Sequence, residues 1–443
     1  MGTKNFSAKL ILDSKREGRA LSGSEIRYFI EGFTRGEIPD YQMSALAMAI
    51  CCRGMTQRET ADLTETMRQS GRSLSWDGLI TADKHSTGGV GDKLSLIIQP
   101  IVAACGVAVP SLTGRGLGIT GGTADKLETI PGYNAALSLE DFEKVVREVG
   151  VSMTVQTAEI TPADKKLYAL RDVTGTVASV PLIVASILSK KLAEGAGVLV
   201  FDVKFGSGAF MKTLDEARTL AQALVDGAKA SGRKSAALIT DMSQPLGYWV
   251  GNANEVMEAI EILKSGRSDF DGNVGSGDEV ALSVELAAMM VSLSKNISLE
   301  EARAMCATKL ADLSAFEKFK AMVNAQGGDL DKFYRAFSAP VFKFKIQAMR
   351  SGYISDISAE RVAHVALSLG AGREKTGDRI DPLAGVTLAV KRGDRIAVGS
   401  PLATLSSSQA PEVLEGAAAE LLKAFTISHT AGESQPMILE RIF

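Results

Sequence analysis

Between positions 83 and 92 the chain reads Asp-Lys-His-Ser-Thr-Gly-Gly-Val-Gly-Asp, a run that combines a cation, an imidazole, two hydroxyls and three glycines. Glycines let the backbone approach an anion closely, so that consecutive N–H groups can converge on it. Lys84, Ser86 and Thr87 add charged and neutral donors, and a helix beginning near 92–95 would add its N-terminal dipole. The run is typical of a phosphate-binding loop, although a glycine-rich surface turn has the same composition.

A second glycine-rich stretch supports the phosphate interpretation. Residues 113–123 contain five glycines and follow the apolar run 107–112. In open α/β sheets the ligand crevice lies at the carboxyl ends of the strands. Two such loops, each after an expected strand, are poorly explained as linkers, so we expect both at the same edge of one sheet.

The pattern of apolar residues predicts the fold class. Up to about residue 70 it is helical, with a capping box at Thr56 to Glu59. Beyond residue 81, expected strands alternate with amphipathic stretches, which favours a mostly parallel sheet with helical crossovers; the best strands are 107–112, 152–156, 198–204 and 236–241. After residue 339, short strands at 386–390 and 395–398 indicate a small C-terminal β-rich domain. We therefore predict an α/β protein with a helical domain, a larger mixed α/β domain and this β-rich domain.

Composition restricts the function classes. A chain of 443 residues exceeds one hydrophobic core, and its net charge of -3 gives no general attraction to nucleic acid or to an anionic membrane. The four cysteines lack metal-ligand spacing and stand in apolar or helical contexts, so we expect reduced core thiols. The start of the chain lacks the apolar block of a signal peptide, and no apolar run reaches the roughly 20 residues of a membrane span. We expect a cytoplasmic protein.

Six segments, in order along the chain, resemble the thymidine phosphorylase and pyrimidine-nucleoside phosphorylase family. They are the two glycine-rich stretches, Thr-Pro-Ala-Asp-Lys-Lys-Leu-Tyr at 161–168, Arg-Asp-Val-Thr at 171–174, Ser-Ile-Leu-Ser-Lys-Lys at 186–191 and Asp-Val-Lys-Phe-Gly at 202–206. The resemblance covers nearly the whole chain. Segments 38–50 and 241–247 look closer to the broad-specificity pyrimidine enzymes.

The resemblance implies how the domains are divided. A helical domain would comprise residues 1–70, and residues 162–194 would return to it. An α/β phosphate-binding domain would comprise 71–161 and 195–338, and a C-terminal α+β domain 339–443. The family also implies a homodimer that forms through the helical domain.

The implied reaction is the reversible phosphorolysis of a pyrimidine nucleoside. Inorganic phosphate would attack the anomeric carbon of thymidine, deoxyuridine or uridine, releasing the base and an α-pentose 1-phosphate with inversion. Such a pentosyltransferase of nucleoside salvage needs no organic cofactor. The site must hold a dianion in line with the glycosidic bond and stabilise charge developing on the base.

The family's site residues carry over position by position. The phosphate site matches Lys84, Ser86, Ser95, Thr113 and Thr123. The catalytic positions are His85, Arg171 and Lys190. Helical spacing alone places Tyr168 beside Arg171, and Ser186 on the same face as Lys190. The base site would be completed by Ser186 and by apolar walls from Leu117, Tyr168, Val177, Ile183 and Phe210.

Each side chain near the base has an implied role. Arg171 and Lys190 would stabilise the base anion through its carbonyl oxygens, and Ser186 would fix a ring edge. His85 would hydrogen-bond to or protonate the departing base. Taken singly, each of these residues would equally suit a solvated helix face or a structural position.

The resemblance also implies a potassium site beside the phosphate loop, built from backbone carbonyls and one carboxylate. The matching positions are Gly91, Lys93, Leu246, Trp249 and Glu258. Trp249 departs from the small residue that the family carries there.

Other departures lie close to the chemistry. Ile119 replaces a histidine of the family pattern, Gly175 an alanine and Ala178 an aspartate. We hypothesise that the histidine and aspartate face each other across the cleft in relatives, so that loss of one made the other a costly unpaired group. We also expect Gly175 to loosen the start of the following helix. Ser111 stands where broad-specificity relatives carry a lysine, which bears on the acceptance of ribose.

Two alternatives stay open. One is a nucleotide phosphorylase or phosphoribosyltransferase of the same fold group, which would require a 5′-phosphate or a diphosphate. The other is a catalytically silent nucleoside or phosphate sensor, motivated by Ile119 and Ala178. Retention of His85, Arg171 and Lys190 favours an enzyme.

Overall fold

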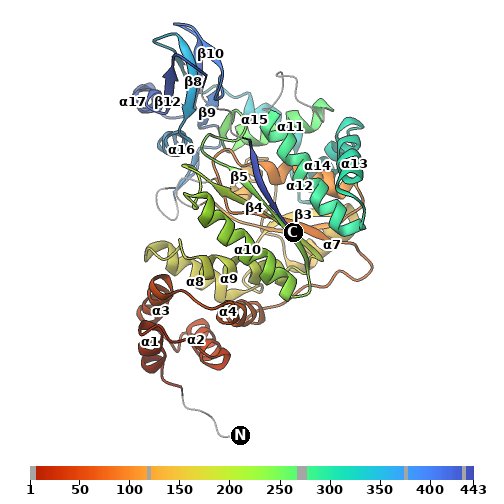
Figure 1. Cartoon of the computed structure of the whole chain (residues 1–443). Coiled ribbons are helices and arrows are strands. Elements are labelled where there is room, and N and C mark those ends of the chain that lie inside the picture. Colours follow the sequence, from red (N-terminus) through yellow and green to blue (C-terminus); the bar gives the residue numbers. More distant parts are fainter. Residues whose placement is uncertain (1–5, 117–120, 267–276, 374–377, 432–435) are drawn as a thin grey trace.

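The computed structural model describes residues 6–116, 121–266, 277–373, 378–431 and 436–443. Figure 1 shows a helical lobe at the N-terminal end, a central sheet flanked by helices, and a smaller C-terminal lobe on the far side of that sheet. The helical lobe contains α1 (Ala8–Arg16), α2 (Gly23–Arg35), α3 (Asp40–Arg53) and α4 (Gln57–Gln69).

Two later helices pack against the helical lobe. They are α8 (Pro162–Val173) and α9 (Val180–Ala193). Ala163 and Leu167 of α8 and Leu182 and Ala185 of α9 share one apolar core with α1–α4. Pro181 lies in the first turn of α9, where its fixed φ suits a helix start.

The central sheet is parallel except for its last strand. Its paired strands run in the order β1 (Ala82–Ser86), β4 (Val198–Phe205), β5 (Lys234–Asp241) and β13 (Ile438–Ile442), and only β13 is antiparallel. A parallel pair, β2 (Val109–Thr113) and β3 (Val151–Val155), lies beside β1 through the bridge of Thr81 to Ala108. The carboxyl ends of β1 and β2 therefore lie at one edge, as predicted for the two glycine-rich stretches.

Alternating side chains of the sheet enter two cores. Val198 and Val200 of β4 face the core formed with α5 and the α11–α14 helices, whereas Leu199 and Phe201 face α9 and α10. This is the period-two arrangement of a strand that is covered on both faces. The helices around the sheet are α5 (Leu94–Ala104), α6 (Thr123–Leu127), α7 (Leu139–Val149), α10 (Leu214–Ala230), α11 (Ala253–Ser265), α12 (Gly277–Lys295), α13 (Leu299–Ala311), α14 (Ser314–Ala325) and α15 (Leu330–Phe337).

The C-terminal lobe is joined to the centre of the molecule by strands. One antiparallel sheet has the order β6 (Trp249–Gly251), β9 (Gly385–Leu388), β11 (Pro401–Ser407) and β7 (Phe342–Gln347), and the other has the order β10 (Arg395–Ile396), β8 (Gly352–Ile357) and β12 (Phe425–Ser428). β6 comes from the segment after β5, and β13 returns the chain to β5. The lobe's helices are α16 (Ala359–Ala366), the π-helical turn Leu367–Ala371 and α17 (Pro411–Leu422).

The predicted fold class is confirmed, with two local differences. The first half of the stretch at 83–92 is strand β1 and not loop; buried charges such as Asp83 and Lys84 hide the apolar pattern of a core strand. The prediction of core thiols is correct for Cys105 and Cys306 but wrong for Cys51 and Cys52, which are exposed on α3. None of the four cysteines forms a disulfide.

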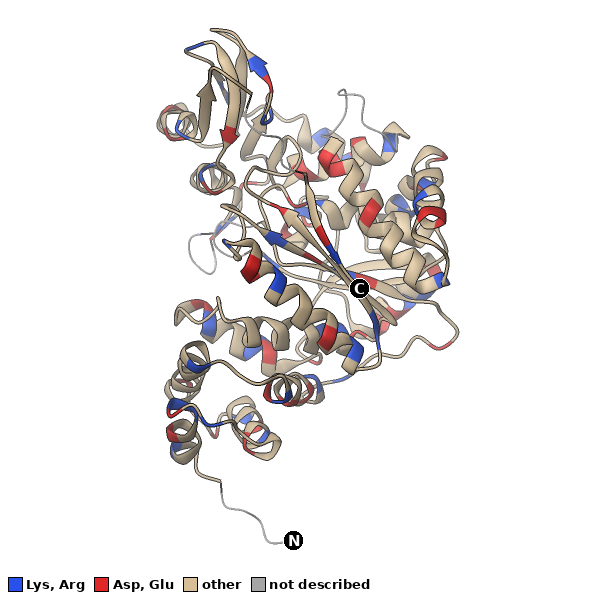
Figure 2. Cartoon of the chain, in the orientation of Figure 1, with Lys and Arg blue, Asp and Glu red and all other residues tan. Residues whose placement is uncertain are grey.

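Charged residues are distributed over the helices and also occur in central strands of the sheet (Figure 2). In the described part of the chain no single helix is long and apolar enough to cross a membrane. The pair α12 and α13 meets the length and composition criteria together, but its two members are bent by 119°.

Candidate active site

The first glycine loop, residues 87–93, is held by local hydrogen bonds. The Ser86 hydroxyl donates to Asp92 Oδ2 at 2.6 Å, and the Gly88 N–H donates to Ser86 Oγ at 3.1 Å. Gly91 has a φ of +72°, and a Cβ there would lie 2.3 Å from the Leu246 carbonyl oxygen. The loop can adopt this course only because glycine tolerates both the left-handed backbone and the close contact.

Lys84 places a buried ammonium with unused donors beside this loop. Its Nζ lies 3.8 Å from Asp202 Oδ2 and has no hydrogen-bond partner among the described residues. The same carboxylate oxygen lies 2.7 Å from Lys204 Nζ, and the Thr240 hydroxyl donates to the other oxygen at 2.7 Å. Asp202 is thus already neutralised and held, which leaves Lys84 free to donate to a further anion.

Asp92 is ionised despite its environment. Burial raises the pKa of this carboxyl, but the charges of Lys204, Lys84 and Lys126 outweigh burial and lower the pKa below its usual range. The ionised carboxylate holds Ser86, one of the expected phosphate ligands, in a fixed orientation.

The second glycine loop brings two more of the expected phosphate residues to the same edge. Thr113 ends β2 and Thr123 begins α6, and the N–H of Ala124 donates to the Gly114 carbonyl at 3.2 Å across the loop. Asp125 anchors the loop by accepting from the Gly116 N–H at 2.6 Å. Ser95 lies in the first turn of α5, next to the first loop. Leu117 and Ile119 lie outside the described residues, so the paired His–Asp hypothesis stays a hypothesis.

The expected base residues of α8 and α9 form one cluster. Lys190 Nζ donates to the Ser186 hydroxyl at 2.9 Å and to the Asp164 carboxylate. The Tyr168 ring centroid lies 6.0 Å from Lys190 Nζ and 5.9 Å from the Arg171 guanidinium carbon. The helical spacing in the sequence therefore predicted the right neighbours.

Arg171 has a structural task that its position in the sequence did not reveal. Its buried guanidinium donates to the backbone carbonyls of Thr176, Val177 and Leu182, at 3.2, 2.7 and 3.1 Å. Burial lowers the pKa of Arg171, opposed by Asp164 and Tyr168, and a guanidinium stays protonated at neutral pH. Three of its five N–H donors hold the turn between α8 and α9 and the first turn of α9, and the other two make no hydrogen bond with the described residues.

His85 is neutral. Burial lowers the pKa of His85 well below its usual range, and the positive charges of Lys191, Lys190 and Lys84 lower it further. A neutral imidazole can donate or accept a hydrogen bond, but it is a poor source of a proton at neutral pH. Of the two roles expected for His85, the structure favours hydrogen bonding.

The expected apolar walls are only partly assembled. Val177 lies in the turn held by Arg171, and Phe210 is 42 % exposed beside Gly88. Ile183 packs against the core between the sheet and α10. We expected Gly175 to loosen the start of the following helix, but it lies in the turn between α8 and α9 with a φ of +66°, where glycine avoids the strain that another residue would have.

A buried cluster beneath the site was not found from the sequence. Lys191 Nζ donates to Asp83, to the Leu112 carbonyl at 3.1 Å and to Glu194 Oε2 at 3.0 Å, so it joins α9 to β1 and β2. Burial raises the pKa of Glu194 well above its usual range, and Asp83 raises it further. Lys191 lay within a quoted motif, but its partners are distant in sequence and only the fold brings them together.

Ser111, the position associated with ribose, is buried. Its hydroxyl accepts from Gln99 Nε2 at 2.7 Å in the core between β2 and α5. The side chain is therefore engaged in packing within the protein.

Two of the five positions of the expected potassium site, Leu246 and Glu258, meet at a protein ammonium, that of Lys93. Lys93 Nζ donates to the Leu246 carbonyl at 3.2 Å and to Glu258 Oε2 at 2.6 Å, and it lies 3.2 Å from Glu279 Oε1. Glu258 also accepts from the Trp249 N–H at 2.9 Å. Because Lys93 Nζ already occupies the point between the Leu246 carbonyl and the Glu258 carboxylate, these two groups do not fit a potassium ion there. Nor do the described residues contain a group of three His, Cys, Asp or Glu side chains that could hold a metal.

Comparisons with known families cover the same regions. Residues 9–71 match the helical bundle domain of the glycosyl transferase family, and residues 79–316 match the a/b domain of that family. Residues 353–428 match the pyrimidine nucleoside phosphorylase C-terminal domain.

Similar proteins extend over almost the full chain. The pyrimidine-nucleoside phosphorylase of Geobacillus stearothermophilus is 45% identical over 438 residues, covering 98% of this chain and 99% of that protein. The thymidine phosphorylase of Agrobacterium fabrum is 44% identical over 439 residues, covering 98% of each. Among solved structures, anthranilate phosphoribosyltransferase from Thermus thermophilus has a TM-score of 0.57 at 19% identity and covers 71% of this chain and 98% of its own, which shows the fold alone.

Proposed function

The chain belongs to the pyrimidine-nucleoside phosphorylase and thymidine phosphorylase family, and we propose that it catalyses the reversible phosphorolysis of pyrimidine nucleosides. Inorganic phosphate is the cosubstrate, and the reaction uses no organic cofactor. A phosphate oxygen forms a bond to the anomeric carbon while the glycosidic C–N bond breaks, and the electron pair of that bond leaves with the base. The pyrimidine anion takes up a proton from water, and the products are the free base and an α-pentose 1-phosphate, so the enzyme is a pentosyltransferase.

The observation that carries the proposal is the buried ammonium of Lys84. An ammonium without a hydrogen-bond partner is costly to bury, and its donors lie at the foot of a glycine loop. A phosphate dianion satisfies these donors. We assign phosphate binding to Lys84 together with Ser86, Ser95, Thr113 and Thr123.

The base side is assigned to the cluster on α8 and α9. Lys190 and the two unused donors of Arg171 stabilise the negative charge that develops on the pyrimidine carbonyls, and Ser186 fixes a ring edge. Neutral His85 donates a hydrogen bond to the departing base. Tyr168, Val177, Ile183, Phe210 and Leu117 are the proposed apolar walls.

We propose a homodimer that forms through α1 and α3. These neighbouring helices expose Leu10, Tyr41 and Met48, with 66%, 73% and 44% of each residue accessible. Tyr41 and Met48 are two helical turns apart on α3 and so share one face of that helix, and exposed apolar side chains of this kind mark an interaction surface. Light scattering should give a dimer mass for the wild type and a monomer mass for Tyr41→Arg combined with Met48→Asp. Met349→Arg, at an exposed position of the C-terminal lobe, should remain dimeric. A monomeric wild type would refute the dimer.

The location that we propose is the cytoplasm. Four cysteines without a disulfide suit a reducing compartment.

The experiment for the reaction is an assay of base release from thymidine, deoxyuridine, uridine and cytidine, with and without phosphate. We expect phosphate-dependent release from thymidine and deoxyuridine. Turnover of uridine as well would make the enzyme a broad pyrimidine-nucleoside phosphorylase, whereas its absence would make it a thymidine phosphorylase. Release from none of the four would refute the proposal; turnover of only 5′-phosphorylated substrates would favour a nucleotide phosphorylase.

A further inference from the structure

Lys93 connects the first glycine loop to a distant part of the chain. It is the N-cap residue of α5, directly after Asp92, and its side chain is buried. Its ammonium reaches the Leu246 carbonyl and the carboxylates of Glu258 on α11 and Glu279 on α12. The loop and three later segments therefore meet at a single positive charge.

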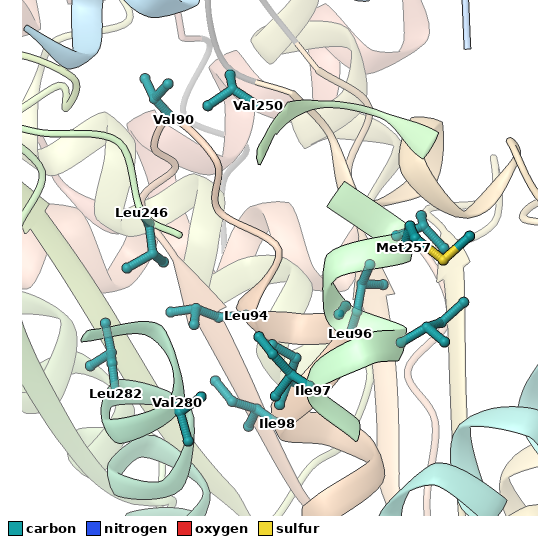
Figure 3. Close-up of a cluster of buried hydrophobic side chains, with 14 of the residues drawn as sticks. Val90, Leu94, Leu96, Ile97, Ile98, Leu246, Val250, Met257, Val280 and Leu282 are labelled. Atoms are coloured by element: carbon teal, nitrogen blue, oxygen red, sulfur yellow. The ribbon is translucent and has the colours of Figure 1, made fainter. Parts of the chain in front are cut away.

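No space is left for a second cation at this point. Gly247 has a φ of +66°, and a Cβ there would lie 2.4 Å from Lys93 Nζ, 2.5 Å from Glu279 Oε2 and 3.0 Å from Glu258 Oε2. A metal ion among the same oxygens would touch the ammonium, and two like charges in contact repel strongly where water is excluded. Apolar side chains of α5, α12 and the 246–250 segment, among them Leu94, Leu246, Val250, Val280 and Leu282, belong to one buried cluster in this part of the molecule (Figure 3).

The charges nearby are also balanced within the protein, because burial, Glu258 and Asp278 raise the pKa of Glu279 to about 8, which leaves the Glu258 carboxylate for the Lys93 ammonium. Lys93 is the only Lys or Arg that pairs with Glu258 or Glu279 among the described residues. The two neighbouring acidic residues pair with other lysines. Lys126 Nζ lies 2.6 Å from a carboxylate oxygen of Glu255, and Lys391 Nζ lies 3.2 Å from one of Asp278. Without the Lys93 charge, Glu258 would be a buried carboxylate held only by the N–H groups of Tyr248 and Trp249.

We propose that the Lys93 ammonium takes the place of the monovalent cation at this site, so that the first glycine loop is held in position without potassium. Lys93 is then a positioning residue. Its charge draws the 246–249 segment against Gly91, and the Leu246 N–H donates to the Val90 carbonyl at 3.0 Å. The link to phosphate binding rests on the proposed function of this loop, but the cation replacement itself does not.

The test measures thermal unfolding in KCl, NaCl and choline chloride at matched ionic strength, without nucleoside or phosphate. For the wild type we expect the same midpoint in all three salts. Lys93→Ala removes the charge and opens space, so potassium should raise its midpoint by about 2 °C or more relative to choline. Lys93→Met removes the charge but fills the space, and potassium should not restore its stability.

Lys15→Ala is the matched control. Lys15 is a buried lysine that pairs with Glu59 at 2.7 Å in the helical lobe, far from the loop. We expect this variant to lose stability with no preference for potassium. A preference in Lys15→Ala equal to that of Lys93→Ala would overturn the proposal, because any vacated lysine site would then bind the ion.

A second readout uses the reaction. Lys93→Ala should show a KM for phosphate raised roughly 10-fold or more in choline chloride, because small displacements of a ligand loop are costly, and potassium should lower it again.

A wild type whose unfolding midpoint rises selectively with potassium would overturn the proposal, even if Lys93→Ala does not fold. An enzyme that releases no base from any nucleoside would refute the proposed function, but the thermal measurements would still decide the role of Lys93.

Discussion

Lys84 lies in strand β1, just before the first glycine loop, and Lys93 is the last residue of that loop; both ammonium groups are buried, but their surroundings differ. Lys84 Nζ has no hydrogen-bond partner among the described residues, whereas Lys93 Nζ meets one carbonyl and two carboxylates within 3.2 Å. A buried ammonium that makes no hydrogen bond is retained at a cost in stability, which points to a ligand. A buried charge with a full set of partners performs a structural task. The contrast separates the ligand-binding end of the loop from the end that fixes its position.

The largest expected effect is at the unpartnered end. Lys84→Met should lower phosphate-dependent base release on the order of 10²–10³-fold, since it removes a charged donor aimed at the nucleophile. Its unfolding midpoint should not fall, because no internal hydrogen bond is lost. Steady-state kinetics and a thermal melt check the two halves. A small kinetic loss with a large thermal loss would reverse the assignment of the two lysines.

Arg171 and Lys190 on the base side also differ in how their charges are held, by backbone carbonyls in one case and by side chains in the other. Arg171→Ala should lose activity on the order of 10²-fold. It should also lose stability, because the backbone carbonyls of Thr176, Val177 and Leu182 lose their donor. Lys190→Ala should lose activity similarly but less stability, since Lys190 is 20% exposed and its partners are side chains.

Arg171→Lys distinguishes the two tasks of this residue. One ammonium cannot reproduce the forked geometry that reaches three carbonyls, so the variant should remain destabilised. Near-normal activity in both alanine variants would contradict their assignment to the base site.

The local features of this molecule could be predicted from the sequence. The capping box of Thr56 and Glu59 is present, and Ser186 lies against Lys190 as their spacing required. These features depend on neighbours within one helical turn. The partners of Lys93 and Lys191 could not be predicted, because Glu258, Glu279 and Asp83 meet them only through the packing of separate elements.

A pH effect should follow from His85. Its pKa is lowered in the folded protein, so the unfolded chain binds more protons below about pH 6.5. Stability should therefore fall as the pH falls through 6.5, by at most about 1.4 kcal/mol per pH unit from this group. Denaturant melts of the wild type and His85→Asn check this. The same slope in both proteins would show that His85 is not the source.

The smallest effect is expected at the turn that Arg171 holds. Gly175→Ala should cost about 1 kcal/mol, because alanine is strained at a φ of +66° although no atom obstructs its Cβ. Gly416, in α17, is equally unobstructed and lacks the left-handed backbone. Gly416→Ala should therefore leave stability unchanged or raise it. Equal effects of the two substitutions in chemical denaturation would mean that the backbone of the 174–176 turn does not constrain residue 175.

The most direct test of the account follows thymidine and phosphate by ³¹P NMR in potassium-free buffer, with the wild type and with Lys84→Met. For the wild type we predict a sugar 1-phosphate of α configuration, formed in step with thymine at a rate that saturates with phosphate. Lys84→Met should form it at least about 100-fold more slowly. Thymine release without a phosphate ester, or equal rates in the two proteins, would contradict the claim that the buried ammonium of Lys84 binds the attacking phosphate.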